Sequence, residues 1–438
     1  MSKEYDVVVV GAGIFGLATA YHIKKSEPEK EILVIDRYGD AGQGNTGRSN
    51  AMFRNTFTSV DNQTLADASI DYYSHVQNEL GFDIGVDMMG YLWLLSERQL
   101  SASESHVSAM VDNGIEIKRY DRDSLKTSIP SLVLDQKSAE ADVMGLESVE
   151  GSIFGPKCGR LAPDRLASFY KDSLLKIGGR FLFNAEASEL LAGPEKPLGL
   201  NGEPFVWQEH RISGVRLADG RELKADTTIV ACGAWNNELL DPLGIDGRCK
   251  SKKRQLFAVK AAGKPSLEGL LHQGGFNSSA VLPFVILPKS GLFIKAVRES
   301  GEFWVGCEDE VKREFITSPQ HDLDKYQAEP AYYEMNVYQV LKEYFPDFTG
   351  AKPHRMWAGL YSYNTLDNMP YIFGDDGLVV AGGDSGSGIM KGDSIGRLVA
   401  AFYGRGDDAE AELYGGKHYR VSKLGFKKRD VEREEWVI

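Results

Sequence analysis

Cysteine is scarce in this chain, and its scarcity argues against several kinds of site. The 438 residues include four scattered cysteines that form no C-x-x-C pair, at Cys158, Cys232, Cys249 and Cys307. This pattern argues against a disulfide framework, a zinc ribbon and a dithiol redox site. The eight histidines are isolated as well, and neither an H-E-x-x-H motif nor a Ser/His/Asp signature is present. The sequence therefore predicts no metal site.

Basic clusters are missing before the short charged tail at 423–433, and the formal net charge is −13. A nucleic-acid surface needs grouped Lys and Arg side chains, so we expect no nucleic-acid partner. Long apolar runs are missing too, since none approaches the roughly 20 residues of a membrane helix. No signal-peptide pattern precedes the first strand. We expect a cytoplasmic, soluble protein without a transmembrane segment, and leave peripheral membrane association open.

The first forty residues alternate between strand and helix patterns. A β-branched run, a glycine-rich turn, a helix-forming segment and a second apolar run follow one another at 5–10, 11–16, 17–23 and 32–35. This order predicts a βαβ unit, the building block of a parallel sheet.

The turn of this unit has the spacing of a dinucleotide-binding motif, Gly11-x-Gly13-x-x-Gly16. The first glycine permits the tight turn, the second lets a pyrophosphate approach the backbone, and the third lets helix and strand pack closely. The helix N-terminus then offers N–H groups to the phosphates. Asp36 ends the second strand, where a carboxylate accepts hydrogen bonds from a ribose.

The rest of the chain alternates between two kinds of pattern. Helical or parallel-strand segments are expected at 166–177, 180–184, 227–233, 378–381 and 395–403, and antiparallel strands fill the intervals, for example at 292–297 and 303–305. We therefore predict an α/β fold, in which a discontinuous Rossmann-like domain holds an inserted antiparallel-sheet (α+β) substrate domain. The expected cofactor domain covers 1–90, 150–245 and 350–438, and the substrate domain covers 91–149 and 246–349.

Three further segments resemble the D-amino-acid-oxidase (DAO) type of FAD-dependent oxidoreductases, which includes sarcosine and glycine oxidases and dye-linked L-proline dehydrogenases. They are 44–54 (GNTGRSNAMFR), 229–235 (IVACGAW) and 379–391 (VVAGGDSGSGIMK). The last, with Leu413–Gly416 after it, is most similar to the L-proline dehydrogenases. In such proteins the first segment wraps the flavin, and the last places backbone N–H groups at its pyrimidine edge.

Together, the turn and the resemblance imply that FAD is the cofactor. The residues expected to bind it are Gly11, Gly13, Ile14, Phe15, Gly16, Asp36, Arg37, Thr46, Arg48, Ser49, Asn50, Ala51, Ala187, Cys232, Gly233, Trp235, Gly383, Ser385, Gly386, Gly388, Ile389, Met390 and Lys391. Sarcosine-oxidase relatives attach flavin to a cysteine, but the comparable stretch at 357–367 contains none. The FAD is therefore predicted to be non-covalent.

The sequence departs from its relatives where they bind the substrate. The position of the carboxylate-binding arginine of glycine oxidases holds Tyr361. We expect Arg54 to replace that arginine, because guanidinium groups pair with carboxylates through two hydrogen bonds. The other candidates for contact with the substrate are Tyr363, Lys391, Arg254 and Lys295. An apolar pocket for a ring such as that of proline is expected from Phe53, Trp357, Tyr361 and Tyr363.

In sarcosine-oxidase relatives a lysine that promotes reaction with oxygen faces the flavin, and the matching place here holds Trp304. The resemblance then implies a dehydrogenase that passes electrons to a dye or quinone. We expect oxidation of a small amine or amino acid, favouring a secondary amino acid such as L-proline, by hydride transfer to flavin N5. The alternatives are an oxygen-using sarcosine or glycine oxidase, a 2-hydroxy-acid dehydrogenase and a non-catalytic flavoprotein assembly factor. The natural acceptor and the oligomeric state stay unknown.

Overall fold

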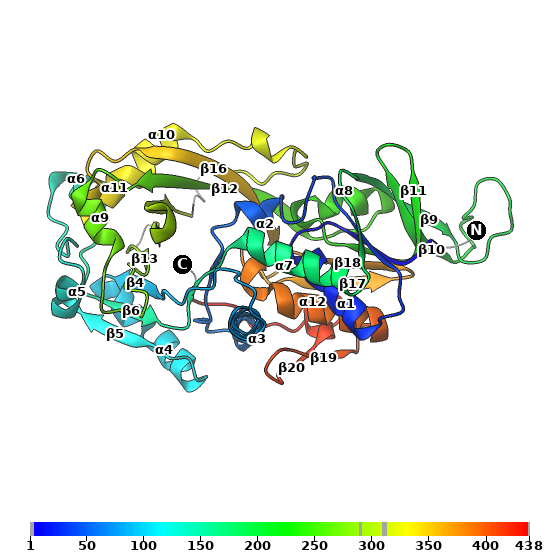
Figure 1. The fold of residues 1–438 in the computed structure, drawn as a ribbon, viewed down its shortest axis with the longest axis horizontal. Coiled ribbons are helices and arrows are strands. Elements are labelled where there is room, and N and C mark those ends of the chain that lie inside the picture. Colours follow the sequence, from blue (N-terminus) through cyan, green and yellow to red (C-terminus); the bar gives the residue numbers. More distant parts are fainter. Residues whose placement is uncertain (1–3, 289–290, 309–312, 437–438) are drawn as a thin grey trace.

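The computed structural model describes residues 4–288, 291–308 and 313–436. Two eight-stranded sheets lie side by side along the long axis of the molecule (Figure 1). The first carries the βαβ unit, and the second is mostly antiparallel. This arrangement confirms the α/β fold with a Rossmann-like part.

The first sheet has a parallel centre with antiparallel strands added to it. Its strands pair in the order β17-β18-β11-β1-β2-β8, and β10 and β9 extend the ladder from β11. The bounds are β1 Tyr5–Val10, β2 Ile32–Ile35, β8 Arg180–Leu182, β9 Ala187–Pro194, β10 His210–Leu217, β11 Glu222–Val230, β17 Tyr371–Asp375 and β18 Leu378–Gly382. Val7, Val8 and Val9 are completely buried, as expected for a strand covered on both faces.

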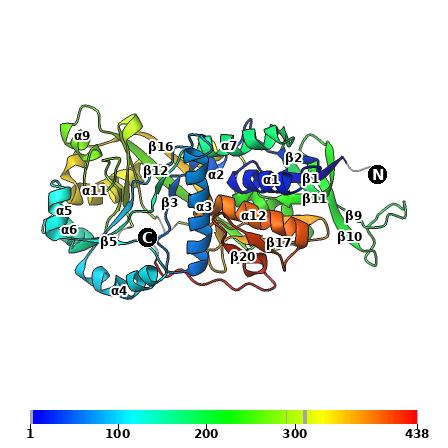
Figure 2. The ribbon, with the colours of Figure 1, turned by 60° about the horizontal axis from the view of Figure 1, so that its bottom comes forward.

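Helices cover one face of this sheet, the face of Val7 and Val9, whereas Val8 and Val10 pack with residues of β9 and β10 on the other. The main ones are α1 Ile14–Ser26, α3 Val60–Asn78, α7 Pro163–Lys176 and α12 Gly388–Arg405. A Cβ on Gly396 would lie 2.6 Å from the Cβ of Ala18, so the glycine allows α12 to pack closely on α1. In Figure 2, α3 stands between the two halves of the molecule.

The second sheet follows the order β16-β12-β15-β14-β13-β4-β6-β5. Its strands are β4 Tyr91–Leu95, β5 Lys118–Asp121, β6 Gly151–Gly155, β12 Cys249–Lys260, β13 Phe284–Ile286, β14 Phe293–Val297, β15 Glu302–Gly306 and β16 Pro353–Asn364. All neighbours are antiparallel except β13 and β4, which are parallel. An aromatic-rich core, including Phe257, Phe303 and Tyr344, lies beneath the surrounding helices.

The remaining elements are short or peripheral. The other helices are α2 Asn45–Arg48, α4 Glu97–Asp112, α5 Arg122–Ser128, α6 Ala139–Met144, α8 Asn236–Leu240, α9 Pro265–Leu271, α10 Pro330–Tyr332 and α11 Tyr338–Tyr344. Two small ladders join β3 Met52–Phe53 to β7 Gly159–Arg160 and β19 Glu410–Glu412 to β20 His418–Arg420. Single helical turns lie at η1 Gly233–Trp235, η2 Asp241–Leu243, η3 Arg298–Ser300, η4 Leu323–Lys325, η5 Tyr333–Val337, η6 Pro346–Phe348 and η7 Val421–Leu424.

Two strands depart from the expected domain boundaries. Both β6 and β16 fall within ranges expected for the cofactor domain, but they are hydrogen-bonded into the second sheet. β16 belongs to the second sheet because it forms a long antiparallel ladder with β12. This ladder runs from the pair Cys249 and Asn364 to the pair Val259 and Pro353. The segment 322–345, whose pattern also predicts a helix, is split into η4, α10, η5 and α11.

Within the described ranges, no helix combines the length and the apolarity needed to cross a membrane.

Candidate functional site

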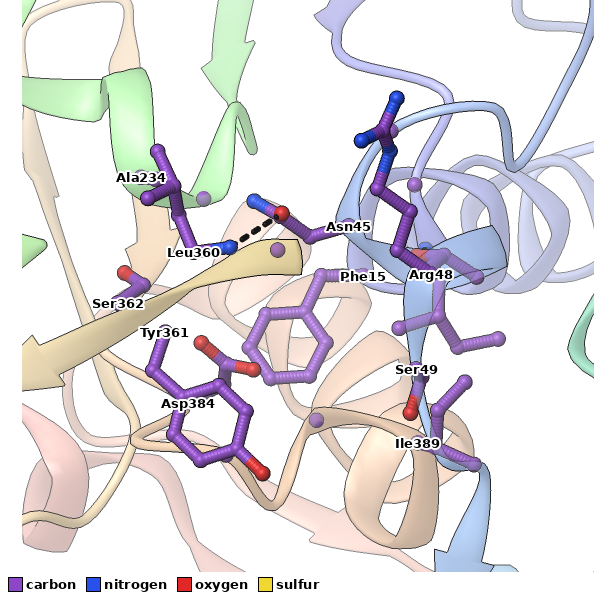
Figure 3. Close-up of a pocket in the computed structure, with 18 of the residues that line it drawn as sticks. Phe15, Asn45, Arg48, Ser49, Ala234, Leu360, Tyr361, Ser362, Asp384 and Ile389 are labelled. Carbon is purple, nitrogen blue, oxygen red and sulfur yellow. Dashed lines mark hydrogen bonds between the residues drawn. The ribbon is translucent and has the colours of Figure 1, made fainter. Parts of the chain in front are cut away.

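A cavity opens at the carboxyl ends of the central strands of the first sheet and continues to the second sheet. It is bordered by residues at the ends of β1, β2 and β11 and by residues of β12 and β16. Ligands of open α/β folds bind at these strand ends, where the βα turns present backbone N–H groups. Figure 3 shows the part between α2, β16 and the start of α12.

The glycine-rich turn has the geometry that its spacing predicts. Gly11 has a φ of +107°, and a Cβ there would lie 2.5 Å from the carbonyl oxygen of Ala231. A Cβ on Gly16 would lie 1.9 Å from the carbonyl oxygen of Gly11, so α1 reaches β1 only because this side chain is missing. A Cβ on Gly13 would meet nothing closer than Thr46 Oγ1, at 3.4 Å. The turn therefore leaves its backbone open towards the cavity.

Asp36 ends β2 beside this turn. Its carboxylate accepts hydrogen bonds from the N–H groups of Ala12 at 2.7 Å and Tyr38 at 2.9 Å. Burial raises the pKa of this carboxyl, and the two N–H groups oppose the shift. The guanidinium of the next residue, Arg37, lies 4.9 Å from the ring centroid of Trp235. This end of the cavity combines a fixed carboxylate with an aromatic wall.

The segment after β2 closes the cavity from another side. The side chain of Asn45 accepts a hydrogen bond from the N–H of Leu360 at 2.8 Å (Figure 3). Arg48 donates to the carbonyl oxygens of Leu323 at 3.0 Å and Ala358 at 3.1 Å, so its guanidinium ties α2 to the second sheet. Asn50 Oδ1 is buried and has no hydrogen-bond partner among the residues that the structure describes, which suits a ligand with an N–H or O–H group.

The loop before α12 is shaped by close approach to aromatic rings. A Cβ on Gly386, which has a φ of +85°, would lie 2.3 Å from the ring of Tyr361. Gly388, Ile389 and Met390 line the cavity and form the first turn of α12. The positive end of an 18-residue helix therefore faces the cavity, where it favours negative charge.

Most of the residues predicted to bind FAD line this cavity. They are Gly11, Gly13, Ile14, Phe15, Asp36, Arg37, Thr46, Arg48, Ser49, Asn50, Ala51, Ala187, Cys232, Gly233, Trp235, Gly386, Gly388, Ile389 and Met390. Four lie behind its wall: Gly16, Gly383, Ser385 and Lys391. Gly16 and Gly383 pack against protein atoms, and Ser385 Oγ accepts a hydrogen bond from Asn364 N at 3.0 Å. Contact of any of these residues with FAD stays a prediction.

Of the side chains predicted to act on the substrate, Arg54, Tyr363 and Lys391 lie outside the lining. Arg54 is buried and donates to the carbonyl oxygens of Thr56 at 2.8 Å and Trp436 at 3.2 Å. Arg54 therefore holds the C-terminal segment at Trp436 in place, and its side chain does not reach the cavity. Lys391 donates to Asn62 Oδ1 at 2.5 Å and to Ser387 Oγ at 2.9 Å.

Arg254, which the sequence offered only as a substitute, does line the cavity. It projects from β12, and its Nη2 donates to Tyr363 Oη at 2.5 Å. Its guanidinium carbon lies 5.4 Å from the ring centroid of Tyr361 and 5.5 Å from that of Tyr363. Burial raises the pKa of both tyrosines to about 12, so they stay neutral donors.

The aromatic wall differs partly from the expected one. Trp357 and Tyr361 line the cavity, whereas Phe53 is fully buried elsewhere. Three aromatic residues of the second sheet that the sequence analysis did not single out complete the lining: Tyr91, Phe284 and Phe293. Asp384 and Glu308 were missed as well, although Asp384 lies within a recognised loop motif. No local signal distinguishes such residues, because the pairing of distant strands brings them here.

A buried cation lies close to Trp304. Lys295 pairs with Trp304 across β14 and β15, and its Nζ lies 4.4 Å from the indole ring. The same ammonium donates to the carbonyl oxygen of Asn50 at 2.5 Å. Burial lowers the pKa of Lys295 to about 7. The expectation that this place offers no cation is therefore wrong, although neither side chain lines the cavity.

The cavity fits a dinucleotide with a flavin ring. The open glycine turn suits a pyrophosphate, Asp36 suits a ribose, and the buried Asn50 oxygen suits a polar ring edge. The residues described include no group of three or more His, Cys, Asp or Glu side chains arranged to hold a metal ion.

Comparisons with known proteins agree with this geometry. The chain is 22% identical over 427 residues to FAD-dependent oxidoreductase domain-containing protein 1 of Xenopus laevis, covering 91% of this chain and 79% of that protein. It is 24% identical over 381 residues to glycine oxidase of Pseudomonas putida, covering 85% and 86%. The structure of L-proline dehydrogenase from P. horikoshii is similar, with a TM-score of 0.72 at 20% identity, covering 93% of this chain and 95% of that one. The family model DAO, FAD dependent oxidoreductase, matches residues 6–402, and the chain therefore belongs to this family.

Proposed function

We propose that the protein uses non-covalently bound FAD to oxidise a small amino acid or amine, with secondary amino acids such as L-proline as the favoured class. The observation that carries this proposal is the position of Arg254. Its guanidinium lies in the cavity wall, and its hydrogen bond to Tyr363 and the nearby Tyr361 ring hold it in place. A fixed guanidinium among aromatic side chains suits a small carboxylate with an apolar body.

Arg254 takes the role that the sequence suggested for Arg54. It would bind the substrate carboxylate, while Tyr91, Phe284, Phe293 and Trp357 surround the apolar part and keep water out. FAD, when bound, supplies the acceptor for the hydride that leaves the substrate α-carbon. The protein contributes orientation and desolvation, which suffice for such a transfer without a metal. The names of several relatives, L-proline dehydrogenase and glycine oxidase among them, support an amino acid as the substrate.

Non-covalent attachment is supported by the absence of cysteine from 357–367. Two other cysteines do line the cavity, Cys232 and Cys307. Burial raises the pKa of Cys232 to about 12, so it stays a thiol and is a poor nucleophile. We expect acid denaturation to release all the flavin into the supernatant. Flavin that remains on the protein in mass spectrometry would contradict this part of the proposal.

We propose that a dye or quinone, and not oxygen, accepts the electrons. Trp304, which the resemblance matches to the lysine of oxygen-using relatives, does not line the cavity, and the ammonium of Lys295 beside it is held by the Asn50 carbonyl outside the lining. After anaerobic reduction by an amine, a quinone-type dye should restore the flavin spectrum much faster than air does. Fast re-oxidation by air with formation of peroxide would make the protein an oxidase.

The test is the visible spectrum of purified protein under anaerobic conditions, before and after addition of candidate substrates. L-proline, sarcosine and glycine represent amino acids, and lactate and glycolate represent 2-hydroxy acids. Bleaching by at least one amine and not by the hydroxy acids supports the proposal. Bleaching by hydroxy acids alone would overturn it in favour of a hydroxy-acid dehydrogenase. A yellow protein that none of them bleaches would favour a non-catalytic flavoprotein.

A further inference from the structure

Asp384 is a carboxyl group in the cavity wall that the proposed function has not used. It lies in the loop between β18 and α12, and its carboxyl group, labelled in Figure 3, interacts with the nearby Tyr361. The backbone of Asp384 is fixed, because its carbonyl oxygen accepts hydrogen bonds from Ser387 N at 2.8 Å and Ser387 Oγ at 2.7 Å. An isolated β-bridge to Tyr363 holds the loop against β16.

Gly388 makes room for the side chain of Asp384. A Cβ on Gly388 would lie 2.6 Å from Asp384 Oδ2, so the carboxylate lies directly over the start of α12. A carboxylate at a helix N-terminus has an ordinary structural explanation in the helix dipole. That explanation does not account for its place in the cavity wall beside Tyr361.

Most charged side chains of the cavity are already engaged on the dinucleotide side. Asp36 accepts two backbone N–H groups, Arg37 lies against Trp235, Arg48 binds backbone carbonyl oxygens and Glu238 contacts His321 at 2.7 Å. The remaining charged residues among the described lining are Arg254, Glu308 and Asp384. Of these three, the proposed function uses Arg254, whose guanidinium also binds Tyr363 Oη, and it leaves Glu308 and Asp384 without a role.

Arg254 and the Asp384 loop approach the same ring. The guanidinium carbon of Arg254 lies 5.4 Å from the ring centroid of Tyr361, and Gly386, two residues after Asp384, would touch that ring with a Cβ. One cavity wall thus carries opposite charges around a single aromatic ring. An amino acid zwitterion has the matching pair of charges on neighbouring atoms.

We propose that Asp384 binds the amino group of the substrate and takes one proton from it. The proposal rests on the proposed function and names its substrate class as amino acids, not hydroxy acids. The ammonium loses one proton to the carboxylate, giving a neutral amine and a carboxylic acid. Deprotonation frees the nitrogen lone pair to form the C=N bond of an iminium ion as the α-hydride leaves, and FAD, when bound, would supply the acceptor for that hydride. Asp384 later returns its proton to water.

The electrostatic setting of Asp384 suits this role. Burial raises its pKa to about 6, while its own backbone, the N–H of Gly388 and the ammonium of Lys391 oppose the shift. Tyr361, Tyr371 and Cys249 also interact with its charge, and burial keeps all three neutral at pH 7. At neutral pH the carboxylate is therefore ionised, yet more basic than an ordinary aspartate, whose pKa is about 3.9.

The experiment compares pairs of ligands that differ only at the amino nitrogen. The amino acid that bleaches the flavin is paired with the analogue in which oxygen replaces nitrogen: L-proline with tetrahydro-2-furoate, or sarcosine with methoxyacetate. Dissociation constants come from the shift of the flavin band for the analogue and from rapid anaerobic kinetics for the amine. In the unmodified protein at pH 7.5 the amine should bind about tenfold more tightly than its analogue.

In Asp384→Asn this preference should disappear while the affinity for the analogue stays nearly unchanged. Arg254→Ala should weaken both ligands. The exposed Asp408, paired with Lys428, provides the matched control Asp408→Asn, which should keep the preference. If Asp384→Asn keeps the preference for the amine, the inference is overturned. The inference is also overturned if the preference is lost in Glu308→Gln and in no other variant.

The pH dependence of the preference for the amine, measured in the unmodified protein, is a second test. This preference should fall as the pH drops through about 6, because Asp384 becomes protonated. A preference that stays constant from pH 5 to pH 8 would also overturn the inference. If no amine bleaches the flavin, the proposed function itself fails. If an amine does so and Asp384→Asn changes nothing, only the inference fails.

Discussion

Arg254 donates a hydrogen bond to Tyr363 across the paired strands β12 and β16, with 2.5 Å between Nη2 and Oη. This contact holds the guanidinium in the cavity wall, whereas Arg54 fastens the C-terminal segment through the carbonyl oxygen of Trp436. We therefore propose Arg254, on a strand of the second sheet, as the substrate-binding residue in place of Arg54.

Replacement of Arg254 by alanine should raise the dissociation constant of a carboxylate ligand such as tetrahydro-2-furoate by roughly 10- to 100-fold. The loss of a charge-assisted hydrogen bond, worth about 1.5–3 kcal/mol, is the cause. The constant can be measured from the shift of the flavin band. The comparison variant Arg54→Lys should change it little. The opposite pattern, with weak binding only in Arg54→Lys, would restore the original assignment.

Gly11→Ala should abolish FAD binding. The new methyl group would lie 2.5 Å from the Ala231 carbonyl oxygen, on a backbone with a φ of +107°. The matched control is Gly269→Ala, in the exposed face of α9, where a Cβ meets nothing within 4 Å. This control should retain FAD and gain about 0.5–1 kcal/mol of stability. The ratio of flavin absorbance to protein absorbance measures the FAD content of both variants. A Gly11→Ala protein with full FAD content would contradict the proposed role of the turn.

The free energy of unfolding should increase as the pH rises above 7, because the buried Lys391 then loses its charge. Burial lowers its pKa to about 7, whereas an unfolded lysine titrates near about 10.4. Between these values the unfolded state binds more protons, so the free energy of unfolding increases with pH, by up to about 1.4 kcal/mol per pH unit for one such group. Lys295, with a pKa of about 7, acts in the same window.

Denaturant titrations at pH 7, 8 and 9 measure this effect. In Lys391→Met the pH dependence should fall by about half, because Lys295 remains. An unchanged slope would show that Lys391 is not the titrating group. A flat profile in the unmodified protein would contradict the lowered pKa of both lysines.

Glu434 should stabilise the start of α3 from the far end of the chain. Its carboxylate accepts hydrogen bonds from Thr58 N at 3.1 Å, Thr58 Oγ1 at 2.9 Å and Ser59 N at 3.2 Å. Glu434→Ala should lower the free energy of unfolding by about 1–2 kcal/mol. The neighbouring Glu435, exposed and paired with His106, provides the control Glu435→Ala, with an expected change below about 0.5 kcal/mol. If Glu434→Ala and Glu435→Ala lower the free energy of unfolding equally, Glu434 does not cap α3.

The parts of the site that depend on local backbone could be predicted from the sequence. The β1–α1–β2 unit, the glycine turn, Asp36 and the loop before α12 all follow from residues that only a particular backbone geometry accepts. The helix α7 and the strands β14 and β15 lie close to their expected ranges for the same reason. Local patterns of apolar and turn-forming residues specify these elements.

The parts that depend on distant pairing could not be predicted. Arg54 and Arg254 look equivalent in the sequence, and only the return of the C-terminal segment to Arg54 and the pairing of β12 with β16 separate them. Strand β16 falls in a range expected for the cofactor domain but pairs in the second sheet, because its partner, β12, lies about a hundred residues away. The proximity of Lys295 to Trp304 likewise requires the register of two paired strands.

The most direct test of the central claim is an anaerobic titration of the purified yellow protein with L-proline, followed at the visible flavin band. Oxidation of an amino acid by bound FAD predicts complete bleaching, with the spectrum restored when a quinone-type dye is added. A colourless purified protein would contradict FAD binding. A yellow protein whose band is unchanged by L-proline, sarcosine and glycine would contradict the proposed oxidation.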